Sequence, residues 1–163
     1  MEREEEDTRE TATSRSRVIV MSMEESKQLI RRFYTEVVGG GDYSNLSSFV
    51  ASDYVDHNTA EGSRGPEVVR THLEAIRRTL PDFTVQIEDV FAEGDYVITR
   101  VTGRGTHLGE WMGIEPTGCE VRLKGINIDR VERGRIAEHW GEADTIGMLA
   151  QMGVDPFVGR IEE

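Results

Sequence analysis

The sequence has one cysteine and very little lysine, and it contains no long hydrophobic run. With Cys119 alone, no disulfide can form within the chain, which is consistent with a reducing compartment. Lysine supplies only Lys27 and Lys124 of the 19 basic residues, and 31 acidic residues give a net charge of −12. Nucleic acid and anionic membranes are therefore not expected partners. The apolar run at 18–21 is too short for a signal peptide or a membrane span, so we expect a cytoplasmic protein.

Several catalytic signatures are also missing. The chain has no HExxH motif, no paired cysteines and no two histidines at metal-ligand spacing on one helix face, which excludes the common zinc motifs. It has no glycine-rich phosphate loop and no GxSxG motif, which excludes the usual nucleotide-binding and serine-hydrolase signatures. These absences remove whole classes of enzyme without selecting one.

The domain organisation is simple. At 163 residues the chain is long enough for one domain with its own core. Residues 1–22 are charged, rich in Ser and Thr and free of aromatic residues, which is typical of a disordered acidic tail. We expect a single folded domain over 23–155 and a C-terminal tail over 156–163.

Three helices are predicted in the first half of the domain. Ser22 and Glu25 fit a capping box that begins a helix ending near Val38. A short helix carries Leu46, Phe49 and Val50, and a brief extended piece follows at 53–58. After a Gly/Ser loop, apolar residues at helical spacing predict a third helix over about 66–80.

From Pro81 onward the hydrophobic period is two, which indicates strands. In the third long strand the alternation slips, because Val121 and Leu123 are odd-numbered but Ile126 and Ile128 are even-numbered. We interpret the slip as a β-bulge near 124–125, and a similar slip at 87–90 predicts a second irregularity. The pattern predicts an α+β fold in which a bent antiparallel sheet of about four long strands wraps around the helices and leaves a cavity.

The end of the domain carries a candidate acid/base group. Asp144 stands directly before the short apolar helix expected at 145–152, and three residues separate it from Trp140, where the expected strand ends. A carboxylate in this place can cap the helix, because the first N–H groups of a helix have no partner within it. It can equally serve as the acid/base group of an apolar pocket, and the sequence leaves both roles open.

Three segments resemble the SnoaL-like polyketide cyclase (ester cyclase) family of the nuclear transport factor 2 superfamily. They are "YVDHN" (54–58), "GTHLGEWMGIEPTG" (105–118) and "GINIDRVERGRIAEHWGEADTIGMLAQMG" (125–153). The resemblance implies a cone-shaped, cystatin-like fold and a homodimer formed through the outer face of the sheet. It also implies an intramolecular aldol ring closure that uses no metal or cofactor, with Asp144 as the acid/base group.

Other candidate site residues surround this carboxylate in the predicted fold. His57 and His107 are the candidates to assist proton transfer, each with the alternative of a structural histidine. Trp140 is expected to line the cavity, which would turn the neighbouring His139 outward. The remaining candidates for substrate binding are Trp111, Arg100 and Tyr54. His72 is interpreted as a structural histidine of the third helix.

The sequence therefore favours an acid/base enzyme that acts alpha to a carbonyl on a small apolar substrate, by cyclisation or isomerisation. Two alternatives stay open: a non-catalytic protein that binds a small molecule, and a dimeric scaffold of the same fold.

Overall fold

The computed structural model describes residues 21–59 and 64–155. Helix α1 (Met23–Arg32) begins at Ser22, which forms the predicted capping box with Glu25, and it continues into a π-helical segment, η1 (Phe33–Gly39). Two further helices precede the four long strands, α2 (Leu46–Phe49) and α3 (Pro66–Thr79). No helix within the described ranges is long and apolar enough to cross a membrane.

Five strands form one sheet in the order β1-β5-β4-β3-β2. Their bounds are β1 (Val50–Asp56), β2 (Thr84–Glu93), β3 (Tyr96–Thr106), β4 (Glu120–Glu132) and β5 (Arg135–Ala143). The four long strands are antiparallel neighbours, whereas β1 pairs with β5 in parallel. The predicted α+β fold is confirmed, and the extended piece expected at 53–58 forms part of a fifth, edge strand.

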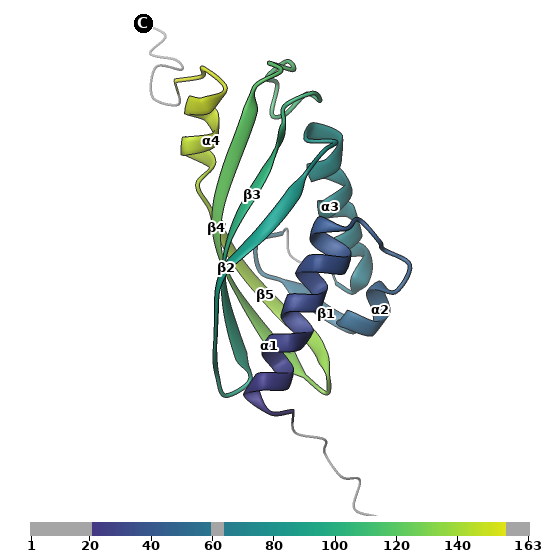
Figure 1. Cartoon of the computed structure of the whole chain (residues 1–163). Helices are drawn as coiled ribbons and strands as arrows, with labels where there is room; N and C mark the ends of the chain where they lie inside the picture. Colours follow the sequence, from purple (N-terminus) through teal and green to yellow (C-terminus); the bar gives the residue numbers. More distant parts are fainter. Residues whose placement is uncertain (1–20, 60–63, 156–163) are drawn as a thin grey trace, which may run out of the picture.

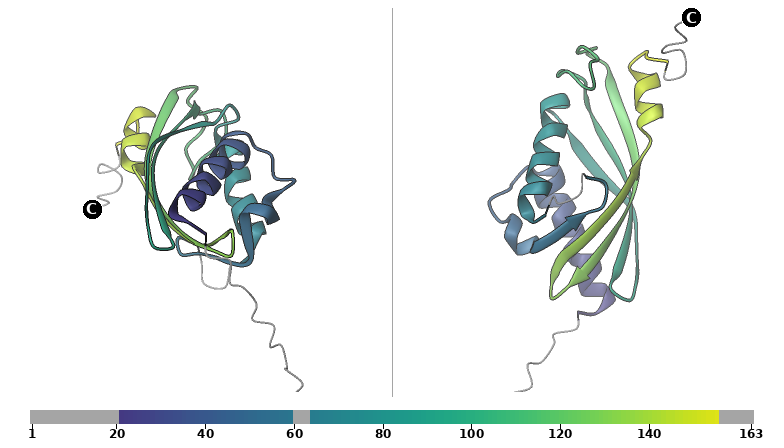
Figure 2. Two further views of the ribbon diagram at one scale, coloured as in Figure 1. Left: turned by 60° about the horizontal axis from the view of Figure 1, so that its bottom comes forward. Right: turned by 180° about the vertical axis from the view of Figure 1, so that it is seen from behind.

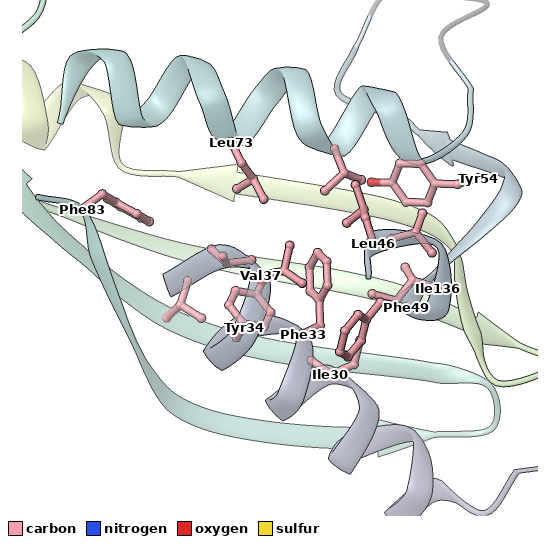
Figure 3. Close-up of a cluster of buried hydrophobic side chains, with 14 of the residues drawn as sticks. Ile30, Phe33, Tyr34, Val37, Leu46, Phe49, Tyr54, Leu73, Phe83 and Ile136 are labelled. Atoms are coloured by element: carbon pink, nitrogen blue, oxygen red, sulfur yellow. The ribbon is translucent and has the colours of Figure 1, made fainter. Parts of the chain in front are cut away.

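The sheet bends strongly and curves around α1 (Figure 1; Figure 2, left). Its concave face meets η1 and α3, and apolar side chains from these helices fill much of the space between them. Figure 3 shows Phe33 and Tyr34 of η1 in the same cluster as Leu73 of α3 and Ile136 of β5. The helices η1 and α3 therefore cover the concave face and not the convex face.

The last helix, α4 (Thr145–Gln151), lies apart from the other helices. Beyond the end of β5 the chain continues beside β4, where the Asp144 N–H donates to the Lys124 carbonyl. Further along, the side-chain amide of Gln151 pairs with both backbone groups of Arg122 at 2.8 and 2.9 Å. Figure 1 shows α4 beside the upper half of β4, on the other side of the sheet from α3.

One predicted irregularity is confirmed and the other is wrong. The register of β2 against β3 shifts between Ile87 and Asp89, as expected. The bulge expected near 124–125 does not exist, because β3 and β4 pair without a shift over the whole of 120–130. The apolar pattern slips for a different reason. At 127 and 129 the residues that face the helices are polar, while Ile126 and Ile128 lie on the convex face and are exposed.

Candidate functional site

A cavity of about 390 Å³ lies between the concave face of the sheet and the helices η1 and α3. Apolar side chains make up most of its wall, including those of Leu73, Ile76, Phe83, Val101 and Leu123. Polar side chains gather at one end, where β1, β5 and β4 lie side by side. The cavity can therefore accept a largely apolar molecule and present a polar group to one part of it.

Three ionisable residues form a row across this polar end. Asp56 of β1 is the register partner of His139 of β5, and His139 is in turn the partner of Asp129 of β4. All three line the cavity. The His139 Nδ1 and the Asp129 Oδ1 are 2.8 Å apart, and Asp129 is 1% exposed. The fold thus holds one imidazole between two carboxylates.

Burial and the two neighbouring carboxylates determine the pKa of His139. Burial lowers its pKa, but the hydrogen bond to Asp129 and the negative charges of Asp129 and Asp56 outweigh burial, so the pKa lies above the ordinary value of 6.5. With Nδ1 bound to Asp129, the proton on a neutral ring is placed at Nδ1, and Nε2 keeps a lone pair. The hydrogen bonds found within the described residues leave Nε2 without a partner.

Neutral hydrogen-bonding groups surround the row. Burial is the largest cause that raises the pKa of Tyr54 and of Tyr34 far above the ordinary value of 10, and nearby carboxylates act in the same direction. Both phenols therefore stay protonated and can donate a hydrogen bond. Burial also lowers the pKa of His72, with the charge of His139 adding to the effect and that of Asp56 opposing it. Asn127 adds an amide to the same wall.

Asp144 is placed outside this cavity. Its exposed carboxylate accepts the N–H of Gly147 at 2.8 Å and so caps α4. It borders a second, more open groove of about 580 Å³ on the convex face, to which Arg100 and Lys124 also belong. Its neighbours Ala143 and Thr145 do line the cavity. Capping alone accounts for the position of this side chain, and its expected catalytic role stays a prediction.

His57 and Trp140 lie together on the convex side of the sheet. Their rings stack in parallel with centroids 4.3 Å apart, and the His57 Nε2 is 2.7 Å from the Glu138 carboxylate. Neither residue lines the cavity. The orientation expected for Trp140 and His139 is therefore reversed: His139 faces the cavity and Trp140 faces outward. Neighbouring residues of β5 face opposite sides of the sheet, as predicted, but the prediction placed the wrong one of the two in the cavity.

His107 and Trp111 belong to the loop between β3 and β4. His107 is completely buried, and its Nδ1 accepts a hydrogen bond from the Thr117 N–H at 3.2 Å. Trp111 packs against the edge of the core and pairs with Ile114. Neither lines the cavity, so His107 holds the loop in place from within the structure.

Arg100 and Tyr54 have opposite placements. Arg100 lies on the convex face, where its guanidinium binds Asp89 at 2.6 Å, with both side chains largely exposed. Tyr54 is 3% exposed and lines the cavity. Of the seven site residues predicted from the sequence, Tyr54 is thus the one found in the cavity wall. The groups that sequence reasoning missed are Asp56, Asp129, His139 and Asn127, together with His72, which was interpreted as structural.

A metal site is not evident in this cavity. Within residues 21–59 and 64–155, no group of three or more His, Cys, Asp or Glu side chains is arranged to hold a metal ion. The polar end is therefore described by the hydrogen bonds and charges of its own side chains.

Comparison with known proteins identifies relatives of this chain. Residues 28–152 match the family described as SnoaL-like polyketide cyclase. The chain is 27% identical over 135 residues to the aklanonic acid methyl ester cyclase AcmA of Streptomyces galilaeus, a match that covers 80% of this chain and 92% of that protein.

Two solved structures show the same fold. The polyketide cyclase IdmH of Streptomyces antibioticus, described as putative, is 35% identical with a TM-score of 0.69, covering 79% of this chain and 99% of that one. TsrD of Streptomyces laurentii is 27% identical with a TM-score of 0.74, covering 82% and 98%. The bent sheet, its helix-covered cavity and these matches lead to one conclusion: the chain belongs to the SnoaL-like polyketide cyclase family.

Proposed function

We propose that the protein closes a ring in an aromatic polyketide by an intramolecular aldol reaction, with His139 and Asp129 as its proton-transfer pair. The observation that carries the proposal is the placement of an imidazole, bound to a buried carboxylate, at the polar end of a largely apolar cavity. This arrangement satisfies the geometric requirements of a general base whose ring is oriented by a second group.

The proposed reaction moves one proton within the site. The Nδ1–H of neutral His139 donates to Asp129, and the Nε2 lone pair takes a proton from the carbon alpha to a carbonyl. The resulting enolate attacks a second carbonyl of the same molecule and forms the new carbon–carbon bond. The imidazolium then returns its proton to the alkoxide. The product is an isomer of the substrate, so the reaction consumes no co-reactant and needs no cofactor.

The neutral donors of the cavity support the enolate in this proposal. Tyr54 and Tyr34 keep their protons, and Asn127 carries amide N–H groups, so all three can donate to an oxygen that becomes negative. Because the apolar wall excludes water, such donors act more strongly there than in solution.

The charge of the cavity favours a substrate with a masked carboxyl group. Among the described residues that line the cavity, none is Lys or Arg, whereas Asp56 and Asp129 both carry a carboxyl group. A free carboxylate would lose its hydration there without gaining a cation. A methyl ester avoids this cost, and the curated relatives are named as cyclases of aklanonic and nogalonic acid methyl esters. We therefore propose a neutral aromatic polyketide ester as the substrate.

The pH profile gives the first test of the pair. Only neutral His139 can accept a proton, so kcat/KM, which reports the free enzyme, is expected to rise with pH through an acidic limb whose apparent pKa lies above 6.5. Asp56→Asn removes one of the charges that raise this pKa, so the limb should move to lower pH. Steady-state rates measured between pH 5 and pH 9 check both statements. A limb below 6.5, or one unmoved in Asp56→Asn, would contradict the role of His139.

The second test separates His139 from Asp144. Asn caps a helix about as well as Asp. We therefore expect Asp144→Asn to keep the unfolding free energy within about 0.5 kcal/mol and kcat within about twofold of the wild-type values. Asp144→Ala should lower the unfolding free energy by about 1 kcal/mol, again with little effect on kcat. Urea unfolding and turnover measured on the same samples check these values. A large loss of turnover in Asp144→Asn at unchanged stability would assign the proton transfer to Asp144 instead.

A binding protein without chemistry is the alternative function, because the apolar wall would hold a small molecule in either case. Incubation with aklanonic and nogalonic acid methyl esters distinguishes the two. Ring closure, followed by chromatography against an enzyme-free control, supports the enzyme. Saturable binding of the esters with no product would support the binding protein.

A homodimer is the proposed assembly. Phe91, Ile98, Ile128 and Trp140 are register partners in a row across four strands of the convex face. Phe91 is 61% exposed and Ile128 is 37% exposed. A second copy seated on this row would remove apolar surface from water.

A further inference from the structure

We infer that Asn58 is a positioning residue that holds the His139–Gly141 segment of β5 in its working geometry. The strand β1 ends next to this segment of β5. The last ladder contact is the His57 N–H donating to the His139 carbonyl at 2.9 Å. The chain then turns away, with the Asn58 N–H donating to the Asp56 carboxylate at 2.9 Å. The N–H and the carbonyl of Gly141 point toward the β1 side of β5, and they therefore have no backbone partner in β1.

The Asn58 side chain takes the place of the missing strand. Its Oδ1 accepts the Gly141 N–H at 2.7 Å, and its Nδ2 donates to the Gly141 carbonyl. A carboxamide offers one acceptor and one donor side by side, as a backbone peptide does. Asp would supply only the acceptor, and Ala would supply neither group. Asparagine therefore supplies both of the groups that Gly141 requires.

The two hydrogen bonds with Asn58 hold Gly141, and Gly141 lies against two polar groups of the cavity. A Cβ at Gly141 would lie 2.6 Å from the Asn127 Oδ1 and 2.9 Å from the His139 Nε2. The proposed base atom and the neighbouring amide thus rest against the bare backbone of this glycine. Any movement of the strand at Gly141 changes the space in which both groups sit. Asn58 acts through Gly141 on His139, and it lies at the rim of the cavity with its amide already engaged.

The chain contains a matched control for this interaction. Gln151 pairs with the backbone N–H and carbonyl of Arg122 in the same two-bond manner, and Gln151 does not line the cavity. Asn58→Ala and Gln151→Ala therefore each delete one amide that completes the edge of a strand. Asn58 lies near His139 and Gln151 does not. The comparison therefore separates an effect on the position of His139 from a general loss of sheet stability.

The experiment compares these two variants by kinetics and by imidazole NMR. We expect Asn58→Ala to lower kcat by about 10- to 100-fold with KM changed less, since small misplacements of a catalytic group have effects of this size. Gln151→Ala should stay within about twofold. In the free protein, the His139 ring resonances and their titration should shift in Asn58→Ala and not in Gln151→Ala. If Asn58→Ala does not fold, Asn58→Asp replaces it in the comparison with Gln151→Ala. Asp keeps the hydrogen-bond acceptor and removes the donor.

The kinetic part rests on the proposed function, but the NMR part does not. A shift of the His139 signals together with an unchanged rate would retain Asn58 as the positioning residue and would count against His139 as the base. Equal effects of Asn58→Ala and Gln151→Ala on both measurements would overturn the inference, because the amide would then only stabilise the sheet.

Discussion

His139→Gln is expected to lower kcat by about 10²- to 10⁴-fold, which is the usual contribution of a positioned general base. Glutamine keeps a polar side chain at the register position between Asp56 and Asp129. Its amide cannot take up and return a proton near neutral pH. The substrate should therefore still bind while ring closure slows. Steady-state kinetics of the variant, together with its Kd for the same ester, measures the two effects separately.

Folding is the necessary control for this variant, because His139 bonds a buried carboxylate. Far-UV circular dichroism and the thermal midpoint should show a folded protein. If a folded His139→Gln variant turned over the ester at the wild-type rate, the imidazole would have no part in the chemistry.

Asp129→Asn should reduce kcat by a similar factor, for a different reason. The carboxylate can only accept from His139, so it fixes the proton at Nδ1 and leaves Nε2 as the base. An amide at this position can donate to Nδ1 instead, which would move the ring proton to Nε2 and remove its lone pair. The variant also removes a negative charge that raises the pKa of His139. Rate measurements should show the loss even at high pH, where the ring is neutral.

Nitrogen chemical shifts of the imidazole separate this tautomer effect from simple unfolding. In the wild-type protein at high pH, the shifts should report a protonated Nδ1, and in Asp129→Asn a protonated Nε2. A variant that keeps the wild-type tautomer and the wild-type rate would show that Asp129 does not orient the ring.

Much of the fold could be predicted from the sequence, because its signals are local. The capping box of Ser22 and Glu25 lies within one helical turn, and the apolar spacing of α1 and α3 follows from the faces they bury. The strand pairing of β1 with β5 was not predicted. It joins segments about 80 residues apart, and nothing in the local pattern of 50–56 encodes that contact.

The site was predicted less well, because its strongest signal was given a structural explanation. The loss of apolar alternation after Leu123 was interpreted as a bulge. In the structure Asn127 and Asp129 occupy the inner face and line the cavity, and Ile126 and Ile128 lie outside. Polar residues in the inner register of a strand were the available sign of the site.

A second error followed from the aromatic residue of β5. Trp140 was predicted to line the cavity as an apolar ring on which a substrate could pack. The convex face of this sheet carries an apolar row, so Trp140 packs there on His57 and turns His139 inward. Which face of a strand lines a cavity depends on the elements that cover it, and here η1 and α3 decide it.

The most direct test of the account is the rate of ring closure of aklanonic acid methyl ester, followed by chromatography of the cyclised product. It should be measured side by side for the wild-type protein, His139→Gln and Asp144→Asn. The wild-type protein and Asp144→Asn are expected to form cyclised product at rates within about twofold, whereas His139→Gln should be slower by at least about 100-fold although it binds the ester. Full activity of a folded His139→Gln variant, with activity lost in Asp144→Asn, would contradict the assignment of the proton transfer to the cavity histidine.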